Sequence, residues 1–479
     1  MQDSATPILG FSDDRKTTRR VFLGTAGAMA MTAASYARIL GASERVNIGL
    51  IGFGLIGKQH LVNLKKFDDV NIIGLSDVYR PRLEEGLALI GNPSARGYSD
   101  FRKMYENKDI QGVLIATPDH WHALQTIMAC QAGKDVYVEK PLTVFIDEGK
   151  WMVQAARKYN RIVVVGTQRR QGIGVAQAKK VVESGVLGKI HSVRIASYRN
   201  IYPGFGKTPV AQPPAGLDYD MWLGPAAKKS YTAHRCLYHF RWFWDYSGGQ
   251  MTNLGAHTID QVLYIMGAKG PTSAASMGGR LVLEDDGEVP DTQDAMWTFP
   301  GGWILNCAIR EANAMRTDPA ARGQVYFGTK GTMILSGNYE VVPENKIDPV
   351  NDIPRFSGHP AGGPVYTDTK PTPWIEASKG GVGSDARYGT GGEDTLAMNE
   401  RNWVDCIRSR KRPLCEVEEG HRVAIACNLA NMSLHLGGRT IRWDPEKEQV
   451  IGDKEAAAMC VKQYRAPWDA ALKSALGKV

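Results

Sequence analysis

The sequence has few of the features that mark metal-binding, disulfide-stabilised or nucleic-acid-binding proteins. Its seven cysteines form no CxxC pair, which argues against a structural zinc site and against a dense disulfide framework. No His, Asp and Glu residues have the spacing of metal ligands, so we expect no bound metal. The formal net charge of +8 is spread along the chain without a dense basic run, which argues against binding of nucleic acid. The cysteines are Cys130, Cys236, Cys307, Cys406, Cys415, Cys427 and Cys460.

Long hydrophobic runs are also lacking. The uncharged stretch at residues 24–37 is too short and too poor in Leu, Ile and Val to span a membrane. It follows the twin arginines Arg19 and Arg20 within the segment TTRRVFLG, which is the pattern of a Tat export signal. We therefore predict that residues 1–44 are a leader, that cleavage occurs near Ser35 or Ala37, and that the protein is exported to the periplasm.

A regular alternation of short apolar runs and helical stretches follows the leader. This alternation is typical of a parallel sheet covered by helices on both faces. We predict an α/β fold that begins with a Rossmann domain, a doubly wound parallel sheet, over residues 45–167. Its expected strands are residues 46–51, 71–77, 111–118, 135–140 and 161–168, with helices near 55–66, 80–91, 100–109, 121–133 and 144–159.

The pattern changes after residue 167, where tight Pro/Gly turns join the apolar runs. Such turns are typical of antiparallel strands, so we predict a second α/β domain over residues 168–440 with a largely antiparallel sheet. Its expected strands lie within 189–197, 294–309 and 323–337, its helices at 395–409 and 420–437, and its long surface loops at 340–392. We expect helix 395–409 to pack back on the first domain and residues 441–479 to form a C-terminal tail.

A glycine-rich turn follows the first predicted strand. Gly52, Gly54 and Gly57 fit GxGxxG, which here opens a helix as in dinucleotide-binding domains. The glycines permit the turn, the approach of backbone to a pyrophosphate and close helix–strand packing. Asp77, at the end of the second strand, would bind ribose hydroxyls and repel a 2′-phosphate, which favours NAD over NADP, although Arg80 keeps NADP open. The predicted cofactor-binding residues here are Gly52, Phe53, Gly54, Leu55, Ile56, Gly57 and Asp77.

Three further segments carry polar side chains that an apolar scaffold does not need. They are ATPDHWH (116–122), VEKPLT (138–143) and DYSGGQMTNLGAHTID (245–260). Their order, GxGxxG, TPxxxH, EKP and GGxxx(D/N)xGxH, closely resembles the glucose–fructose oxidoreductase/inositol dehydrogenase/MocA (Gfo/Idh/MocA) family. The resemblance spans residues 45–435. GTQRR at 166–170, HFRWFWDYSGG at 239–249 and the leader resemble its secreted, Tat-dependent, sugar-processing branch.

The resemblance implies a role for each of these segments. Lys140 would hydrogen-bond the reacting hydroxyl, a role that suits a lysine in a partly dry cleft. His257 would exchange the proton of that hydroxyl, a role that suits an imidazole. Many relatives have aspartate in place of Asn253, so here the asparagine would orient His257 or bind substrate, with Asp260 as a possible acidic partner. Further predicted cofactor contacts are Thr117, Pro118, His120, Trp121, His122, Glu139 and Lys140. Predicted substrate contacts are Gln168, Arg169, Arg170, Arg241, Trp242, Asn253 and His257, with Trp242 open to a role in the core.

The functional expectation is an exported NAD(P)-dependent oxidoreductase acting on a hydroxyl of a carbohydrate or glycoside. The resemblance also implies an open face of the second sheet that supports a homodimer or homotetramer. One alternative is a glycosidase that oxidises its sugar transiently on bound NAD and then re-reduces it. A second is a non-catalytic sensor of sugar or NAD. A chain exported in the folded state carries its dinucleotide from the cytoplasm, which favours a tightly held NAD.

Overall fold

The computed structural model describes residues 45–315, 323–346, 355–356, 364–365, 372–380 and 394–477. The predicted leader, residues 1–44, lies outside the described residues, as does most of the region from 347 to 393. From Asn47 onward the chain belongs to one compact unit. No described helix is long and apolar enough to cross a membrane.

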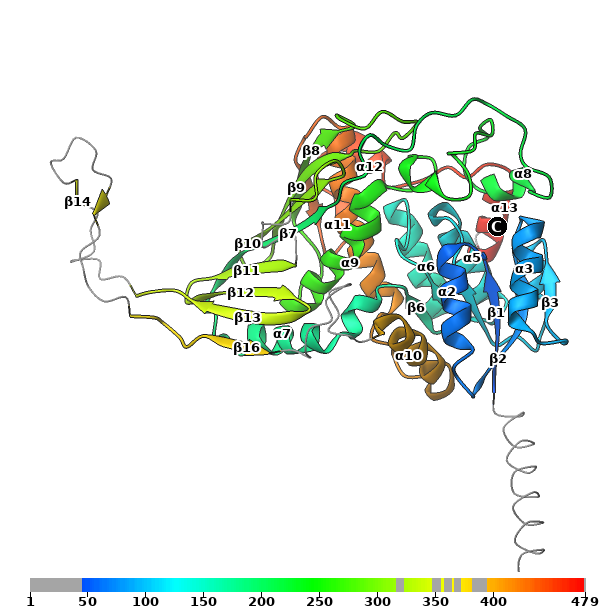
Figure 1. Ribbon diagram of the computed structural model, residues 1–479, viewed down its shortest axis with the longest axis horizontal. Coiled ribbons are helices and arrows are strands. Elements are labelled where there is room, and N and C mark those ends of the chain that lie inside the picture. The colour runs from blue at the N-terminus through cyan, green and yellow to red at the C-terminus, as the bar shows by residue number, and fades with distance from the viewer. Residues whose placement is uncertain are drawn as a thin grey trace, which may run out of the picture. The chain divides into compact units, whose positions relative to one another are not determined.

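A parallel six-stranded sheet forms where the sequence alternates apolar runs with helical stretches (Figure 1). Its strand order is β3-β2-β1-β4-β5-β6, the doubly wound order of a Rossmann domain, so the predicted fold of the first domain is confirmed. The three-residue edge strand β3 was not predicted, because its residues are polar and show no apolar run. The strands are β1 (Val46–Ile51), β2 (Val70–Ser76), β3 (Arg96–Tyr98), β4 (Gly112–Ile115), β5 (Asp135–Val138) and β6 (Val163–Val165).

Helices connect these strands close to the predicted positions. The fourth begins at Asp119, two residues before the predicted start, because Pro118 lies at its N-cap with extended backbone (φ −59°, ψ 150°). That start places the TPDHWH segment at the carboxyl end of β4, on the cofactor edge of the sheet. The helices are α2 (Leu55–Leu64), α3 (Arg80–Ile90), α4 (Phe101–Tyr105), α5 (Asp119–Gln131) and α6 (Ile146–Lys158).

The second sheet has ten strands in the order β16-β13-β12-β11-β7-β10-β9-β8-β17-β18. Its pairs are antiparallel except for β7 and β10, which run parallel, so it is largely antiparallel as predicted. Most of β13 and all of β16 lie within the stretch 340–392, which was predicted to be loops. That prediction was wrong for these residues, because prolines and glycines between the strands hide their alternation. The strands are β7 (Ile190–Tyr198), β8 (Ser273–Gly279), β9 (Thr292–Phe299), β10 (Trp303–Arg310), β11 (Gln324–Gly328), β12 (Gly331–Ser336), β13 (Asn338–Pro343), β16 (Ser378–Gly380), β17 (Ile441–Asp444) and β18 (Gln449–Val450); β14 (Arg355–Phe356) and β15 (Pro364–Val365) pair separately.

Helices pack against one face of this sheet (Figure 1). The indole N–H of Trp297 on β9 donates to the carbonyl oxygen of Ala426 at 2.9 Å and so ties sheet to helix. On β8 and β9 the opposite face exposes Met277 and Met296. The helices that pack on the sheet are α7 (Ile173–Glu183), α9 (Gly249–Met266) and α11 (Val417–His435).

The C-terminal residues do not form a separate tail, which corrects the sequence-based expectation. β17 pairs with β8 and extends the second sheet. Two helices follow, α12 (Lys454–Ala458) and α13 (Trp468–Leu476). α13 packs on the first domain, where the ring of Trp468 lies 4.8 Å from that of Trp121.

Helix α10 (Thr395–Ser409) has the predicted bounds and lies against the first domain. Arg401 on this helix donates to Asp69 at 2.7 Å and stacks over Phe67, with 5.0 Å from guanidinium to ring centre. Asp394 caps the start of α10 by accepting from the backbone N–H of Ala397 at 3.0 Å. The helix therefore belongs in space to the Rossmann half, although it follows the second sheet in sequence.

Candidate active site

A cavity of about 520 Å³ opens at the carboxyl ends of the Rossmann strands. Its far wall comes from the segment before α9, with α8 (Tyr219–Leu223) and the 3-10 helix η2 (His239–Trp242), and from α9 itself. A volume of this size suits a small-molecule or cofactor site. The predicted residues that line it are Gly52, Phe53, Gly54, Leu55, Ile56, Asp77, Thr117, Pro118, Trp121, Glu139, Lys140, Gln168, Arg241, Asn253 and His257.

The glycine turn has the geometry that a dinucleotide requires. Gly52 has φ +89°, and a Cβ there would lie 2.7 Å from the carbonyl oxygen of Ala116. A Cβ on Gly57 would lie 2.2 Å from the carbonyl oxygen of Gly52, so Gly57 permits close packing of α2 instead of lining the cavity. Within the described ranges no side chain caps the first turn of α2, and no acidic residue occupies that turn. Its amide groups are thus suited to bind a phosphate.

Asp77 closes the other end of the cofactor region. Its carboxylate accepts from the backbone N–H of Phe53 at 2.7 Å and from that of Tyr79 at 2.8 Å. Burial raises the pKa of Asp77, and these two hydrogen bonds and Arg82 oppose the rise. Arg82, which lines the cavity, is the arginine near this carboxylate, whereas Arg80 pairs with a glutamate at the surface.

Lys140 and Asn253 meet within the cavity. The Nζ of Lys140 donates to Oδ1 of Asn253 at 2.7 Å. Asn253 donates to Gln250 at 3.1 Å, and Gln250 in turn donates to Glu311 at 2.9 Å. This chain of donors fixes the amide so that its oxygen faces the lysine. Burial lowers the pKa of Lys140 below its ordinary value, although the carboxylates of Glu139 and Asp119 oppose the change.

His257 lies one helical turn after Asn253 and lines the same cavity. Burial lowers its pKa well below 6.5, and the charges of Arg169 and Lys140 lower it further, so the imidazole is neutral at pH 7. Its Nδ1 has no hydrogen-bond partner in the part of the chain that the structure describes. A neutral imidazole beside a cationic lysine can accept a proton from a hydroxyl.

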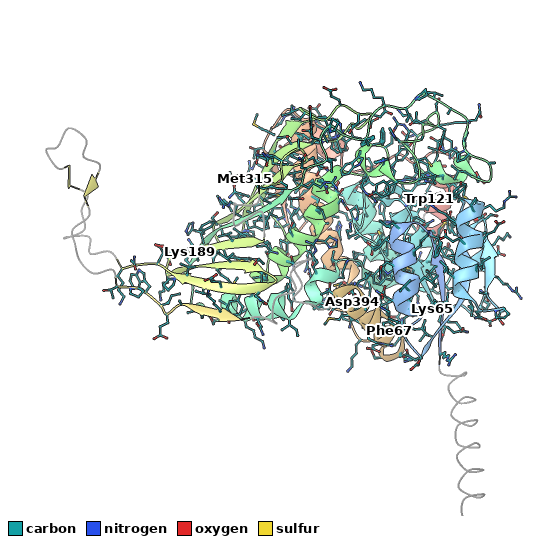
Figure 2. All side chains as sticks on the ribbon, viewed as in Figure 1. Lys65, Phe67, Trp121, Lys189, Met315 and Asp394 are labelled. Atoms are coloured by element: carbon teal, nitrogen blue, oxygen red, sulfur yellow. The ribbon has the colours of Figure 1, made fainter. Side chains whose placement is uncertain are left out.

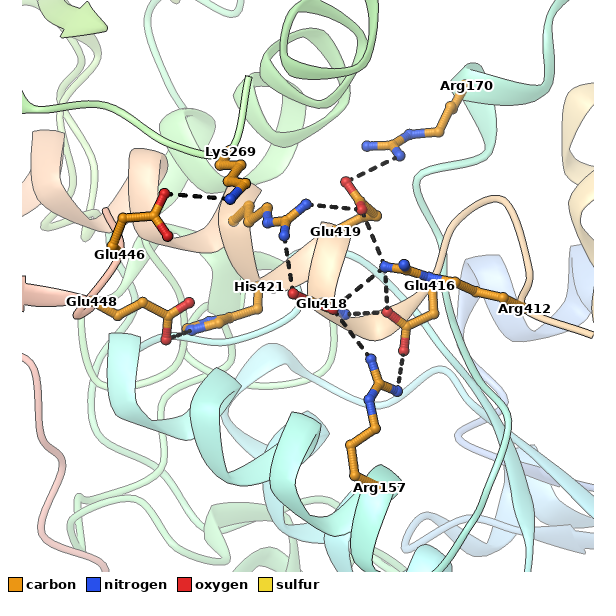
Figure 3. A network of polar contacts seen from close by, with 11 residues as sticks. Arg157, Arg170, Lys269, Arg412, Glu416, Glu418, Glu419, His421, Glu446 and Glu448 are labelled. Carbon is orange, nitrogen blue, oxygen red and sulfur yellow. Dashed lines mark hydrogen bonds and ion pairs between the residues drawn. The ribbon is translucent and has the colours of Figure 1, made fainter. Parts of the chain in front are cut away.

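Arg170 and Asp260 do not belong to the cavity. Arg170 donates to both carboxylate oxygens of Asp260, at 2.7 and 3.1 Å, and both side chains are buried. Its other amino group lies 3.5 Å from Glu419 in an ionic network at the start of α11 (Figure 3). The predicted substrate contact of Arg170, and the alternative in which Asp260 assists His257, are therefore wrong: this ion pair is part of the protein's framework.

Three other predicted residues are held away from the cavity by neighbouring groups. Nε2 of His120 contacts the carbonyl oxygen of Trp222 at 3.1 Å. The ring nitrogens of His122 contact the carbonyl oxygens of Pro141 and Thr117 at 2.7 and 2.9 Å, which ties together the ends of two strands. Trp242 is buried, and a guanidinium covers its ring at 5.0 Å. These residues support the site without lining it.

Arg169 is a separate case. It does not line the cavity, yet its charge lowers the pKa of both His257 and Lys140. Its guanidinium has no acidic partner among the described residues, and burial lowers its pKa. Arg169 therefore remains a predicted substrate contact at the margin of the site.

Sequence reasoning missed Asp119, a buried carboxylate in the cavity wall that accepts a hydrogen bond from Ser247. Its position as the first residue of a helix at the cofactor edge is the signal that could have found it. Arg82 also lines the cavity, near Asp77, and was not among the predicted contacts. No cluster of three potential metal ligands occurs in the described ranges.

Comparisons with known proteins agree with this architecture. Two descriptions of one family match: "Oxidoreductase family, NAD-binding Rossmann fold" over residues 46–167, and "Oxidoreductase family, C-terminal alpha/beta domain" over 171–285 and 394–470. Levoglucosan dehydrogenase of Pseudarthrobacter phenanthrenivorans is 34% identical over 322 residues, 62% of this chain and 74% of that protein. Myo-inositol 2-dehydrogenase of Thermotoga maritima is 30% identical over 251 residues, 52% of this chain; the match spans 64% of the relative, slightly under two thirds of its length.

Solved structures share the fold. A levoglucosan dehydrogenase in complex with NADH and levoglucosan has a TM-score of 0.59 and 19% identity, over 83% of this chain and 99% of that one. The WlbA dehydrogenase of Bordetella pertussis, in complex with NADH and UDP-GlcNAcA, has a TM-score of 0.57 and 20% identity, over 84% and 99%. With its NAD-binding Rossmann domain, its cavity and these matches, the chain belongs to the Gfo/Idh/MocA oxidoreductase family.

Proposed function

We propose that this protein is an exported oxidoreductase that transfers hydride between a hydroxyl of a carbohydrate or glycoside and a tightly bound NAD. The observation that carries the proposal is the meeting of Lys140, Asn253 and neutral His257 in one cavity with a dinucleotide turn. Among the described residues, the ammonium group of half-buried Lys140 donates only to an amide oxygen, and a scaffold gains nothing from such a contact. An alcohol dehydrogenase needs both a donor and a base at that place.

The residues present fit a nicotinamide dinucleotide. Gly52 and Gly57 leave the close approach that a pyrophosphate needs, and Asp77 lies where ribose hydroxyls bind. When bound, the nicotinamide supplies the hydride acceptor or donor. The protein's own task is then to orient the substrate and to move one proton.

His257 and Lys140 divide that task. The neutral imidazole accepts the proton of the substrate hydroxyl during oxidation and returns it during reduction. Lys140 donates a hydrogen bond to the same oxygen and stabilises the negative charge that develops there. Asn253, held by Gln250, keeps the ammonium group at the cavity wall.

A carbohydrate fits the remaining wall. Trp222, Tyr238 and Phe240 present aromatic rings to the cavity, and Gln168 and Arg241 present polar groups. Rings pack against the C–H faces of sugars, while amide and guanidinium groups bind hydroxyls. The names of the relatives, an inositol and a levoglucosan dehydrogenase, support the same substrate class.

Export and cofactor retention are linked in the proposal. The twin arginines Arg19 and Arg20 support transport of a folded chain that already holds its dinucleotide. An enzyme outside the cytoplasm cannot exchange soluble NAD, so turnover must restore the cofactor in place. This favours a second substrate that returns the hydride, or a redox-neutral reaction on one glycoside.

The redox-neutral alternative is a glycosidase. Oxidation of a ring hydroxyl would acidify a neighbouring C–H, the aglycone would leave by elimination, water would add, and the same hydride would return. The predicted leader is the feature that favours it over net dehydrogenation.

Nucleotide analysis and two parallel assays test the proposal. Mass spectrometry of small molecules released by denaturing the purified protein should find NAD near one equivalent. Absorbance at 340 nm with free sugars, and aryl release from aryl glycosides, separate the two reactions. Net NADH or a keto-sugar indicates dehydrogenation, and aryl release without NADH indicates the glycosidase.

Three variants complete this test. Lys140→Met and His257→Ala should abolish either reaction, while Lys189→Met, an exposed lysine at the start of the second sheet (Figure 2), should leave it unchanged. Wild-type function that survives both cavity substitutions would instead support a non-catalytic sensor.

We also propose that the chain forms a homodimer or homotetramer through the exposed face of the second sheet. Met277 and Met296 lie on neighbouring strands with their side chains on this face, 70% and 47% exposed. Apolar side chains exposed together on a sheet are suited to burial against a second copy. Light scattering of the wild type and of a Met277→Glu/Met296→Glu variant tests this, and an unchanged mass would refute it.

A further inference from the structure

His60 is fully buried between two carboxylates. It lies on α2, three residues after Gly57, the last glycine of the turn. Its Nδ1 lies 2.5 Å from Oε1 of Glu400 on α10, and its Nε2 lies 3.1 Å from Oε1 of Glu139. Its ring also packs edge to face against that of Tyr137, with 5.1 Å between the ring centres. Two acceptors therefore meet the two ring nitrogens.

This arrangement favours a charged imidazole over a neutral one. A neutral histidine has one N–H and can donate to one carboxylate, whereas the imidazolium donates to both. Burial alone would lower the pKa of His60, but the hydrogen bonds and charges of Glu139 and Glu400 raise it to about 9. Burial raises the pKa of Glu400, and the hydrogen bond and charge of His60 oppose that rise. The three side chains thus fit a buried Glu⁻–His⁺–Glu⁻ set whose members depend on one another.

Glu139 connects this set to the active site. Its second oxygen, Oε2, accepts the backbone N–H of Lys140 at 3.1 Å. On its other side a Cβ at Gly166 would lie only 2.6 Å from Oε1 of Glu139, so a glycine at this position leaves the space that the carboxylate occupies. The position of the lysine backbone is therefore fixed through Glu139.

Helix α10 fixes the far end of the set. Asn399, the neighbour of Glu400, donates to the carbonyl oxygen of Val165 at 3.0 Å and to the hydroxyl of Tyr137 at 3.2 Å. Asp69 of the Rossmann domain accepts from Arg401 at 2.7 Å. Contacts on both sides of Glu400 thus hold α10 in register with β5 and β6.

We propose that His60 is a positioning residue: its imidazolium, anchored by Glu400 of α10, holds Glu139 and through it the backbone of Lys140 in the active geometry. Glu400, 340 residues after His60 in the sequence, thereby acts on Lys140 without touching substrate. The inference rests on the proposed role of Lys140.

NMR of histidine-labelled protein tests the charge of His60 without any substrate. The imidazole signal that disappears in His60→Gln should remain that of an imidazolium from pH 6 to 8. In Glu400→Gln, which keeps the Glu139 partner, the same signal should titrate at lower pH. A neutral His60 at pH 7 in the wild type would overturn the inference, whether or not the protein turns over a sugar.

Kinetics test the positioning role. His60→Gln should lower kcat at least tenfold while KM changes little, because the loss concerns the geometry of Lys140 and not the sugar contacts. Glu139, without its cationic partner, should raise the pKa of Lys140, so the corresponding limb of the pH–rate profile moves to higher pH by roughly one unit. Adding Glu400→Gln to His60→Gln should cost less than Glu400→Gln does alone.

The matched control is Asp405→Asn, a surface residue of the same helix that pairs with Arg401 outside the set. It should match the wild type in kcat and pH profile. Wild-type kinetics in both His60→Gln and Glu400→Gln, with an active parent enzyme, would refute positioning by His60. An inactive parent enzyme with a charged His60 would instead refute the proposed function alone.

Discussion

Replacement of Asp260 by alanine should destabilise the protein without impairing its cavity. The change removes the carboxylate to which the guanidinium of Arg170 makes two hydrogen bonds. The Arg170 side chain is only 3% exposed, so its charge would be left buried without this partner. Although burial lowers the pKa of Arg170, Asp260 raises it above its ordinary value, so the group stays charged in the folded state. Removing one partner of such a pair costs ~3–5 kcal/mol.

The neighbours of Arg170 place the expected cost near the lower end of that range. Glu419 lies 3.5 Å from Nη1, and the carbonyl oxygen of Leu414 lies 3.4 Å from it. Both survive the substitution and partly compensate the charge, so we expect a loss of about 3 kcal/mol. Replacing the pair together, as Arg170→Met/Asp260→Leu, should cost roughly 1 kcal/mol or less, because no uncompensated charge remains.

Urea denaturation followed by tryptophan fluorescence measures both losses, and fluorescence titration measures the affinity for NAD. We expect the single variant to be the less stable, with NAD affinity and sugar KM close to wild type in both. Equal stability of Asp260→Ala and wild type, together with a large rise in KM for the sugar, would refute the structural role of the pair. It would return Arg170 to the substrate contacts predicted from the sequence.

Three further predictions concern the active site and its support. Asn253→Asp puts a carboxylate 2.7 Å from the Nζ of Lys140, so the pKa of Lys140 should rise by roughly one to three units. An unchanged position of the limb of the pH–rate profile that reports Lys140 would contradict this. Asp77→Ser removes the charge that repels a 2′-phosphate, and the affinity for NADP relative to NAD should increase about tenfold in fluorescence titrations; an unchanged ratio would assign specificity elsewhere. The pKa of His60 is raised from 6.5 to about 9. Its contribution to the free energy of unfolding, relative to His60→Gln, should therefore be complete below pH 6.5 and should be lost as pH rises through 9, by up to ~3 kcal/mol. A difference between the two proteins that does not depend on pH between 6 and 9.5 in urea titrations would exclude a charged His60.

The features that depend on neighbours in sequence were predictable. The run of residues 46–51, followed by a glycine with positive φ, specifies a strand and a tight turn whatever lies elsewhere in the chain. The place of Asp77 at the end of the second strand was predictable from the lengths of the helix and strand that come before it. The 3.6-residue period gave α10 its bounds and placed Asn253 and His257 on one helix face. The export signal remains a prediction, because residues 1–44 lie outside the described structure.

Side-chain partners were decided by the tertiary structure. Arg169 and Arg170 are adjacent and chemically alike, yet only the second meets Asp260, 90 residues away. Asn253 turns to Lys140, 113 residues away, because Gln250 holds its amide. A sequence encodes the local backbone and the faces of its elements, since these depend on short-range sterics and periodicity. Which polar groups meet depends on how the faces pack, since a buried charge requires a partner and only the folded chain determines which one is within reach.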